Sequence, residues 1–155
     1  MGKNLKILVP FDGSEYSKRA LDKAIEIAKD GNSVLHLLMA VGAPAVEPPG
    51  IAVSGLLRGK GATGAIREFV KRAYSRANQI LEQNADYCRR KGVNVNYKVV
   101  GDHPANAILE YAKRSNTDLI VMGSKGLRGI KKIKVLGSVS RHVLENASCP
   151  VLIVH

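Results

Sequence analysis

The sequence contains no tryptophan, only two cysteines and no long hydrophobic run. Cys88 and Cys149 are too few and too far apart for a disulfide framework, and no Cys-x-x-Cys or Cys/His spacing indicates a zinc site. We therefore expect both cysteines to be buried apolar residues. No apolar run is long enough for a membrane-spanning helix or for a signal peptide. These absences predict a soluble, cytoplasmic protein.

Positive charge is in excess, because 24 Lys and Arg residues against 13 Asp and Glu residues give a formal net charge of +11. Such a charge attracts phosphates, nucleic acid or an acidic partner, but it specifies neither a fold nor a particular ligand. Aromatic residues make up only 5% of the chain, so few side chains are available to stack on single-stranded bases. Nucleic-acid binding therefore stays an alternative that the sequence does not favour.

Hydrophobic periodicity alternates between strand and helix along the chain. Short apolar runs predict strands at residues 6–10, 33–41, 93–101, 118–123 and 151–154. Apolar positions at helical spacing predict helices within residues 11–31, 65–91, 104–115 and 138–148. Gly31 and Gly92 are expected to stop two of these helices, and Pro104 to start a third. This order predicts one α/β domain, residues 1–155, with a five-stranded parallel sheet sandwiched between helices.

The apolar positions also predict which helix faces are buried. In the first helix they are Ala20, Leu21, Ala24, Ile27 and Ala28; in the long helix they are Ile66, Phe69, Val70, Ala73, Ala77, Ile80, Leu81 and Cys88.

A long segment rich in glycine and proline, residues 43–64, separates the second strand from the long helix and is predicted to be a flexible loop. It ends in "GKGATG", Gly59 to Gly64, which matches the letters of the G-x-G-x-x-G dinucleotide fingerprint. That fingerprint must directly follow a strand, whereas this copy follows a loop. We therefore do not interpret it as a dinucleotide site.

Ligands of open parallel sheets bind beyond the carboxyl ends of the strands, where the strand order reverses. The candidate loops are those after Pro10 and after Met122. In the second loop, Gly123 and Gly126 permit positive φ and a close approach of the main chain to a ligand. Ser138 and Ser140 lie in the first turn of a helix, where free N–H groups favour an anion such as phosphate. The simpler alternative, a turn followed by a helix cap, stays open.

Three stretches resemble the universal stress protein family: "VPFDGSEYSKRAL", "VMGSKGLRG" and "LGSVSRHVLENASCPVLIV". The ATP-binding branch of that family has the pattern Gly, two residues, Gly, nine residues, Gly-Ser/Thr. Gly123, Gly126, Gly137 and Ser138 match it, except that ten residues, 127–136, separate the last two glycines. The loop must therefore bulge or shift its register to bring the same donors together.

The resemblance implies a Rossmann-like fold, similar to the adenine nucleotide alpha hydrolases, with strand order 3-2-1-4-5. It implies that Asp12 meets the adenosine, that Ala40 and Met122 lie near the adenine, and that the glycines and serines hold the phosphates of ATP with its Mg²⁺. The nucleotide-binding residues expected on this basis are Pro10, Phe11, Asp12, Ala40, Met122, Gly123, Gly126, Gly137, Ser138, Val139 and Ser140. Asp12 has a second interpretation, as a cap of the first helix through Asp12-x-x-Glu15.

Neighbouring basic side chains provide charge for phosphates, although at most one or two of them are expected to touch the ligand. They are Lys125, Arg128, Lys131, Lys132 and Lys134.

No catalytic residues are indicated, because the sequence has no nucleophile elbow and no metal-binding His/Glu set. His36, His103, His142 and His155 are interpreted as structural. We expect a nucleotide-binding module that hydrolyses ATP slowly at most. The alternatives are a family member that binds no ATP and serves as an interaction module, and a basic nucleic-acid-binding protein.

The last strand, Val151–Val154, is short and apolar. In the universal stress protein family this strand commonly pairs with its copy in a second subunit, which would protect an exposed edge. A homodimer is therefore expected.

Overall fold

The computed structural model of the chain describes residues 3–42, 64–127 and 135–155. The predicted loop at residues 43–64 lies outside them apart from Gly64, and so do residues 59–63 of the "GKGATG" segment. Of the basic residues considered above, Arg128, Lys131, Lys132 and Lys134 also lie outside the described residues.

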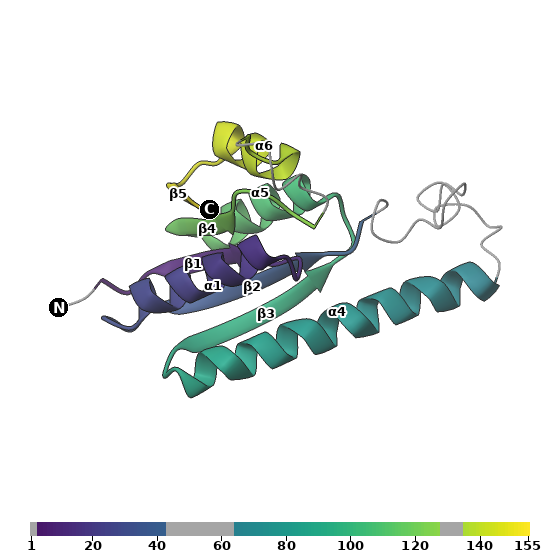
Figure 1. Cartoon of the computed structure of the whole chain (residues 1–155), viewed down its shortest axis with the longest axis horizontal. Helices are drawn as coiled ribbons and strands as arrows, with labels where there is room; N and C mark the ends of the chain where they lie inside the picture. Colours follow the sequence, from purple (N-terminus) through teal and green to yellow (C-terminus); the bar gives the residue numbers. More distant parts are fainter. Residues whose placement is uncertain (1–2, 43–63, 128–134) are drawn as a thin grey trace.

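The described elements follow the predicted order (Figure 1). The strands are β1 (Lys6–Pro10), β2 (Val34–Ala40), β3 (Asn94–Val100), β4 (Leu119–Gly123) and β5 (Val151–Val154). The helices are α1 (Glu15–Ala28), α4 (Gly64–Arg90), α5 (Pro104–Ser115) and α6 (Ser138–Asn146). The strands form a 5-stranded sheet in the order β3-β2-β1-β4-β5, and neighbouring strands are parallel. The predicted fold class and strand order are confirmed.

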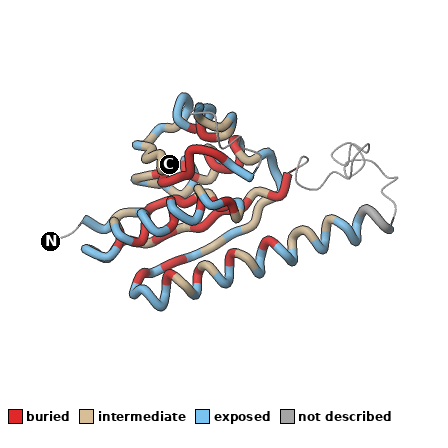
Figure 2. The backbone as a smooth tube through the Cα atoms, viewed as in Figure 1, coloured by how far each residue is buried: buried red, intermediate tan, exposed pale blue. Residues whose placement is uncertain are grey.

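Two apolar clusters cover the two faces of this sheet. One contains Leu21 of α1, Leu81 of α4 and the strand residues that face them. The other contains Ile108 of α5, Val143 of α6 and the opposite faces of the central strands. β1 lies at the centre, and Ile7, Leu8 and Val9 have no exposed surface, because helices cover both sides of it (Figure 2). Among the described helices, none is long and apolar enough to cross a membrane.

The starts and ends of the helices follow local chemistry. α1 is capped by Ser14, whose Oγ accepts from the Ser17 N–H at 3.1 Å, so the second interpretation of Asp12, as the cap of this helix, is wrong. Gly92 has φ of 80°, as expected for a residue that ends a helix, and lies two residues beyond the end of α4. Pro104 begins α5, as predicted.

The predicted buried face of α4 is fully buried only in its carboxyl-terminal half, while Val70 and Ala73 are partly buried against the same core. Ala77, Leu81 and Cys88 are buried, and burial raises the pKa of the Cys88 thiol to about 11. Phe69, by contrast, is 43% exposed, because the amino-terminal half of α4 extends beyond the strands (Figure 1). Cys149 is only half-buried, so the expectation of two fully buried cysteines holds for Cys88 alone.

Close packing between α1 and β4 gives the first prediction. A Cβ added to Gly123 would lie 2.7 Å from the carbonyl carbon of Tyr16, closer than real contacts allow. We expect Gly123→Ala to lower the free energy of unfolding by about 1–3 kcal/mol, because backbone must shift to admit the methyl group. Urea denaturation measures this. The control is Gly64→Ala, which meets no atom within 4 Å and should change stability by less than about 0.5 kcal/mol. Equal effects of the two substitutions would contradict the packing argument.

Candidate functional site

The two predicted loops meet at one edge of the sheet. β1 and β4 are neighbours, paired through Ile7↔Leu119 and Leu8↔Ile120, and the chain leaves the sheet after Pro10 and after Gly123. Because the strand order reverses between β1 and β4, this edge is the switch point of the sheet. Pro10 is half-buried there, and Phe11 is buried with its N–H donating to the Leu38 carbonyl at 2.8 Å.

Asp12 connects the two loops. Its Oδ1 accepts from the Ser14 N–H at 2.9 Å, and its Oδ2 accepts from the Leu127 N–H at 3.2 Å. Gly13, between Asp12 and Ser14, has φ of 82°, a conformation that glycine adopts without strain. The carboxylate therefore joins the turn between β1 and α1 to the segment that follows β4.

Gly123 and Gly126 are needed for close packing and not for unusual backbone angles. Neither has the positive φ that the sequence interpretation allowed. At Gly123 the space of a Cβ is taken by the backbone of Tyr16, and at Gly126 it lies 2.8 Å from Asp12 Oδ2. The two glycines thus let α1 and a carboxylate approach the end of β4.

The segment between β4 and α6, residues 124–137, is called the β4–α6 loop below. Its two ends are joined, because the Gly137 N–H donates to the Ser124 carbonyl at 2.8 Å. The Ser140 hydroxyl donates to the carbonyls of Gly123 at 2.9 Å and Ser124 at 3.2 Å. A Cβ on Gly137 would lie 3.8 Å from the Gly126 nitrogen. The motif glycines therefore lie together, and the tenth residue between them does not separate the two ends of the loop.

The amino terminus of α6 stands at the joined ends of this loop. Gly137 is its N-cap, with φ of −62° and ψ of 156°, and no side chain caps it. N–H groups in the first turn of a helix, here those of Ser138, Val139 and Ser140, have no acceptor within the helix. Together with the helix dipole they favour an anion at this position. Ser138 is exposed and Val139 half-buried, so an anion can approach this turn.

Two predicted site residues have buried side chains that are engaged within the protein, one by backbone carbonyls and one by the core. Ser140 is 3% exposed, and its hydroxyl points at the end of β4, so only its N–H is left for a ligand. Met122 is 4% exposed and packs in the cluster with Leu8 and Leu38. Ala40 is half-buried at the end of β2, where it pairs with Val100 of β3. It lies two residues beyond Leu38, which pairs with Pro10 of β1. Its main chain lies beside the end of β1, as the predicted site requires.

Ser124 and Lys125 lie between the two motif glycines and are both buried. Ser124 Oγ has no hydrogen-bond partner among the described residues, which is unusual for a buried hydroxyl. Sequence reasoning did not single out Ser124; its place inside the Gly-x-x-Gly pattern was the available signal. The Lys125 ammonium lies 5.9 Å from the centre of the Tyr16 ring. Positive charge is thus held close to the joined ends of the loop.

No metal centre accompanies these donors in the described part of the chain, which has no group of three or more His, Cys, Asp and Glu side chains. His36 Nδ1 lies 2.9 Å from the Tyr111 hydroxyl, and burial lowers the pKa of His36. This supports the structural interpretation of that histidine.

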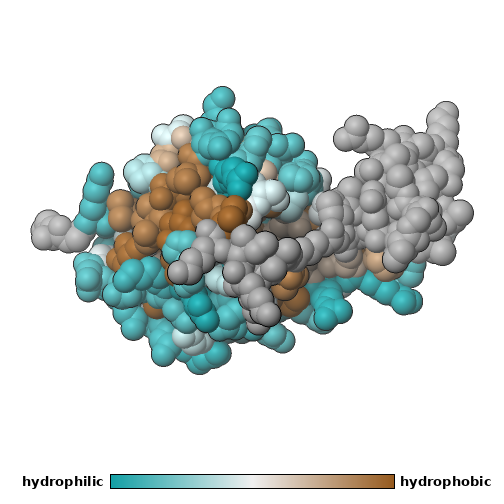
Figure 3. Space-filling model, turned by 45° about the horizontal axis from the view of Figure 1, so that its top comes forward, coloured by the Kyte–Doolittle hydropathy of each residue, from teal (hydrophilic) through white to brown (hydrophobic). Residues whose placement is uncertain are grey.

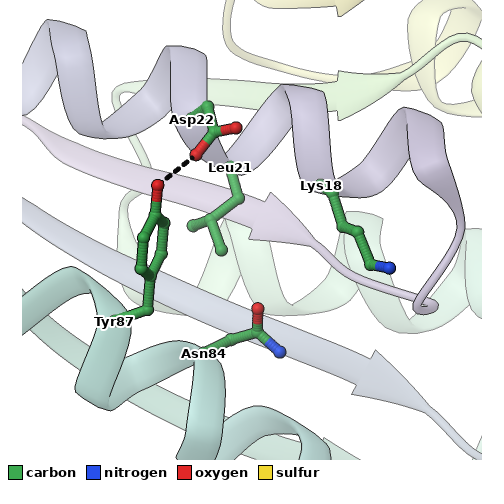
Figure 4. Close-up of a pocket in the computed structure, with 5 residues that line it drawn as sticks. All are labelled: Lys18, Leu21, Asp22, Asn84 and Tyr87. Carbon is green, nitrogen blue, oxygen red and sulfur yellow. Dashed lines mark hydrogen bonds between the residues drawn. The ribbon is translucent and has the colours of Figure 1, made fainter.

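A separate pocket lies between α1 and α4 (Figure 4). Lys18, Leu21, Asp22, Asn84 and Tyr87 line it, and none of them was predicted as a site residue. The Tyr87 hydroxyl donates to Asp22 Oδ1 at 2.9 Å, and this bond raises the pKa of Tyr87. The pocket shares no lining residue with the donors at the β4–α6 loop.

Comparisons with known proteins agree with the fold. A sequence profile described as the universal stress protein family matches residues 3–155. Universal stress protein YxiE of Bacillus subtilis is 37% identical over 149 residues, which cover 96% of this chain and 97% of that protein. Among solved structures, the hypothetical protein MJ0577 of Methanocaldococcus jannaschii has a TM-score of 0.80 at 25% identity, covering 96% of this chain and 94% of that one. A universal stress protein crystallised in complex with cAMP has a TM-score of 0.68 at 26% identity, covering 98% and 97%.

The inward hydroxyl of Ser140 gives a prediction that separates it from Ser138. Ser140→Ala leaves two buried carbonyls with one donor fewer, so we expect it to lower the free energy of unfolding by about 1–3 kcal/mol. The matched control is Ser138→Ala, two residues earlier in the same turn and exposed, which should lower the free energy of unfolding by less than about 0.5 kcal/mol. Thermal and urea unfolding measure both. A Ser140→Ala protein as stable as wild type would show that its hydroxyl does not hold the loop.

Proposed function

This chain belongs to the universal stress protein family, and from that premise we propose that it binds ATP at the β4–α6 loop and acts as a nucleotide-dependent stress-response or signalling module. The observation that carries the proposal is the junction of Ser124, Gly126 and Gly137 at the amino terminus of α6. It gathers free N–H groups, an exposed serine and a nearby lysine at the switch point of the sheet, where this class of fold binds ligands.

The residues present fit an adenine nucleotide in outline. The N–H groups of Ser138, Val139 and Ser140 suit the phosphates, and Ser138 adds a hydroxyl. Asp12 and the main chain at Ala40 lie on the β1 and β2 side, where the nucleoside would lie. The relative crystallised with cAMP supports an adenine nucleotide as the ligand class. Magnesium would arrive with the phosphates and not on a cluster of protein ligands.

Binding, and not rapid catalysis, is the proposed activity. The groups at the loop are amides, hydroxyls and a lysine, and Asp12 already accepts two N–H groups. No described residue beside α6 is placed to orient a water for attack on a phosphate, so hydrolysis would be slow at most. ATP would then act by changing the population of conformations that a partner recognises. The cytoplasmic location expected from the sequence stays a prediction.

The rival functions differ in what they predict for the same protein. The interaction module without ATP drew its support from the ten-residue spacing, but Gly126 and Gly137 lie together in spite of that spacing. The nucleic-acid hypothesis rests on the net charge of +11 alone. Neither gains a specific observation from the structure, and both remain as outcomes of the binding experiment.

Nucleotide binding is tested on the purified protein after denaturation, by chromatography of any released nucleotide and calorimetric titration of the stripped protein with Mg-ATP. We expect one ATP per chain and weaker binding of adenosine, which lacks the phosphates held by α6. Ser138→Ala should weaken ATP binding by about tenfold to a hundredfold, the loss of one hydrogen bond to a charged group. Gly126→Val should also weaken it, because the added side chain would displace Asp12 Oδ2 from the loop.

The same titration identifies the alternatives. No nucleotide and no binding would leave the interaction module as the better account. Salt-dependent binding of DNA or RNA that ATP does not affect would favour the nucleic-acid hypothesis. Because Ser138→Ala is expected to keep its stability, a loss of affinity in that variant reports on the ligand contact.

A homodimer through β5 is also proposed. β5 is the edge strand beside β4, and all four of its residues are only half-buried. Figure 3 shows a hydrophobic area over the side of the molecule where β5 lies. An edge of this kind invites pairing with a second copy. Light scattering over a range of concentrations should give the mass of two chains, and the mass of one chain at every concentration would contradict the proposal.

A further inference from the structure

Several hydrogen bonds hold the ends of the β4–α6 loop, and one of them links it to the end of β1 through a carboxylate. The Ser124 carbonyl accepts from Gly137 N–H and from the Ser140 hydroxyl, which joins β4 to α6. A further bond runs from the Leu127 N–H to Asp12 Oδ2 and joins the loop to the end of β1. It connects residues 115 positions apart and links the described start of the loop to the end of β1.

The direction of the Asp12 carboxylate is set by its own turn. Oδ1 accepts from the Ser14 N–H, and Gly13 supplies the positive φ that lets the chain turn back. Ser14 is in turn fixed, because it is 6% exposed and its Oγ caps α1. With one oxygen held by Ser14, the other oxygen is presented to the loop. Asp12 is therefore a rigid acceptor for the loop, although its side chain is solvent-exposed.

Gly126 fits this arrangement. A Cβ at position 126 would lie 2.8 Å from Asp12 Oδ2, so the carboxylate occupies the space that any other residue would need. The next residue, Leu127, has a side chain that is 71% exposed, so its backbone and not its side chain makes the contact. The absence of a side chain at Gly126 thus allows the Asp12 carboxylate to reach the Leu127 N–H.

A carboxylate so close to a phosphate-binding turn needs a reason, because like charges repel. Two N–H groups already bind Asp12, which offsets part of its charge and gives it a structural role. We propose that Asp12 is a positioning residue, whose bond to the Leu127 N–H fixes the Gly126–Leu127 peptide against the β1–α1 turn and holds the loop in its nucleotide-binding form. This inference rests on the proposed ATP site and adds to it a role for Asp12 that does not require contact with the nucleotide.

Two substitutions remove this bond from opposite sides. Asp12→Asn leaves a single side-chain oxygen, which is expected to keep the shorter bond of the local turn, to Ser14 N–H at 2.9 Å, so that the Leu127 N–H loses its acceptor. Leu127→Pro removes the donor and leaves Asp12 untouched. The matched control is Leu127→Ala, which trims the same exposed side chain and keeps the N–H. Circular dichroism and thermal unfolding establish that each variant is folded before binding is measured.

We expect Asp12→Asn and Leu127→Pro each to weaken Mg-ATP binding by about fivefold to tenfold, because a smaller fraction of the free protein is then in the binding form. Because both remove the same bond, the double variant should bind no more weakly than the worse single variant, within about twofold. Leu127→Ala should bind as wild type does. Unchanged affinity in Leu127→Pro, or losses that multiply in the double variant, would overturn the positioning role.

Hydrogen exchange of backbone amides tests the bond without any nucleotide. In Asp12→Asn the Leu127 amide should exchange at least about fivefold faster, whereas the Gly137 amide, bonded to Ser124, should keep its wild-type rate. Unchanged exchange at Leu127 would overturn the inference. If wild type binds no ATP and Leu127 still depends on Asp12, the proposed function fails and the positioning bond stands, so the two failures are distinguishable.

Discussion

The carbonyl oxygen of Ser124 is the point on which the candidate site depends. It belongs to the first residue after β4 and accepts from both the Gly137 N–H and the Ser140 hydroxyl, so the end of a strand, a loop and a helix meet at one acceptor. A buried carbonyl can take two donors, and losing either would leave a polar group poorly satisfied in the interior. This junction places the amino terminus of α6 at the switch point and keeps Gly126 beside Gly137, whatever the length of the chain between them.

The sheet supplies the rigid frame for that junction. β1 is fully covered on both faces and has a parallel neighbour on each side, so the ends of β1 and β4 are fixed relative to each other. Asp12 and the loop then meet across this edge, and the helix terminus adds a partial positive charge. The net charge of +11 acts at longer range and would raise the local concentration of an anion without choosing its position. Fold, junction and charge therefore favour the same class of ligand by separate physical effects.

Sequence reasoning succeeded where the signal was local or periodic. The five strands, their order, the glycine that ends α4 and the proline that begins α5 all followed from patterns within short windows or from the family resemblance. It failed where the outcome depended on contacts between distant segments. Phe69 has the spacing of a buried residue but lies on a part of α4 that the sheet does not cover. The tight packing at Gly123, the inward hydroxyl of Ser140 and the bond from Leu127 to Asp12 require positions that only the folded chain brings together.

The most direct test of the central claim is an amide ¹H–¹⁵N spectrum of the stripped protein titrated with Mg-ATP and, separately, with adenosine. If the junction of β4 and α6 binds the phosphates, the amides of Gly126, Ser138 and Val139 should shift most with ATP and much less with adenosine. Equal shifts with the two compounds would place the phosphates elsewhere. Shifts confined to other parts of the protein, with the first turn of α6 unchanged, would contradict the account.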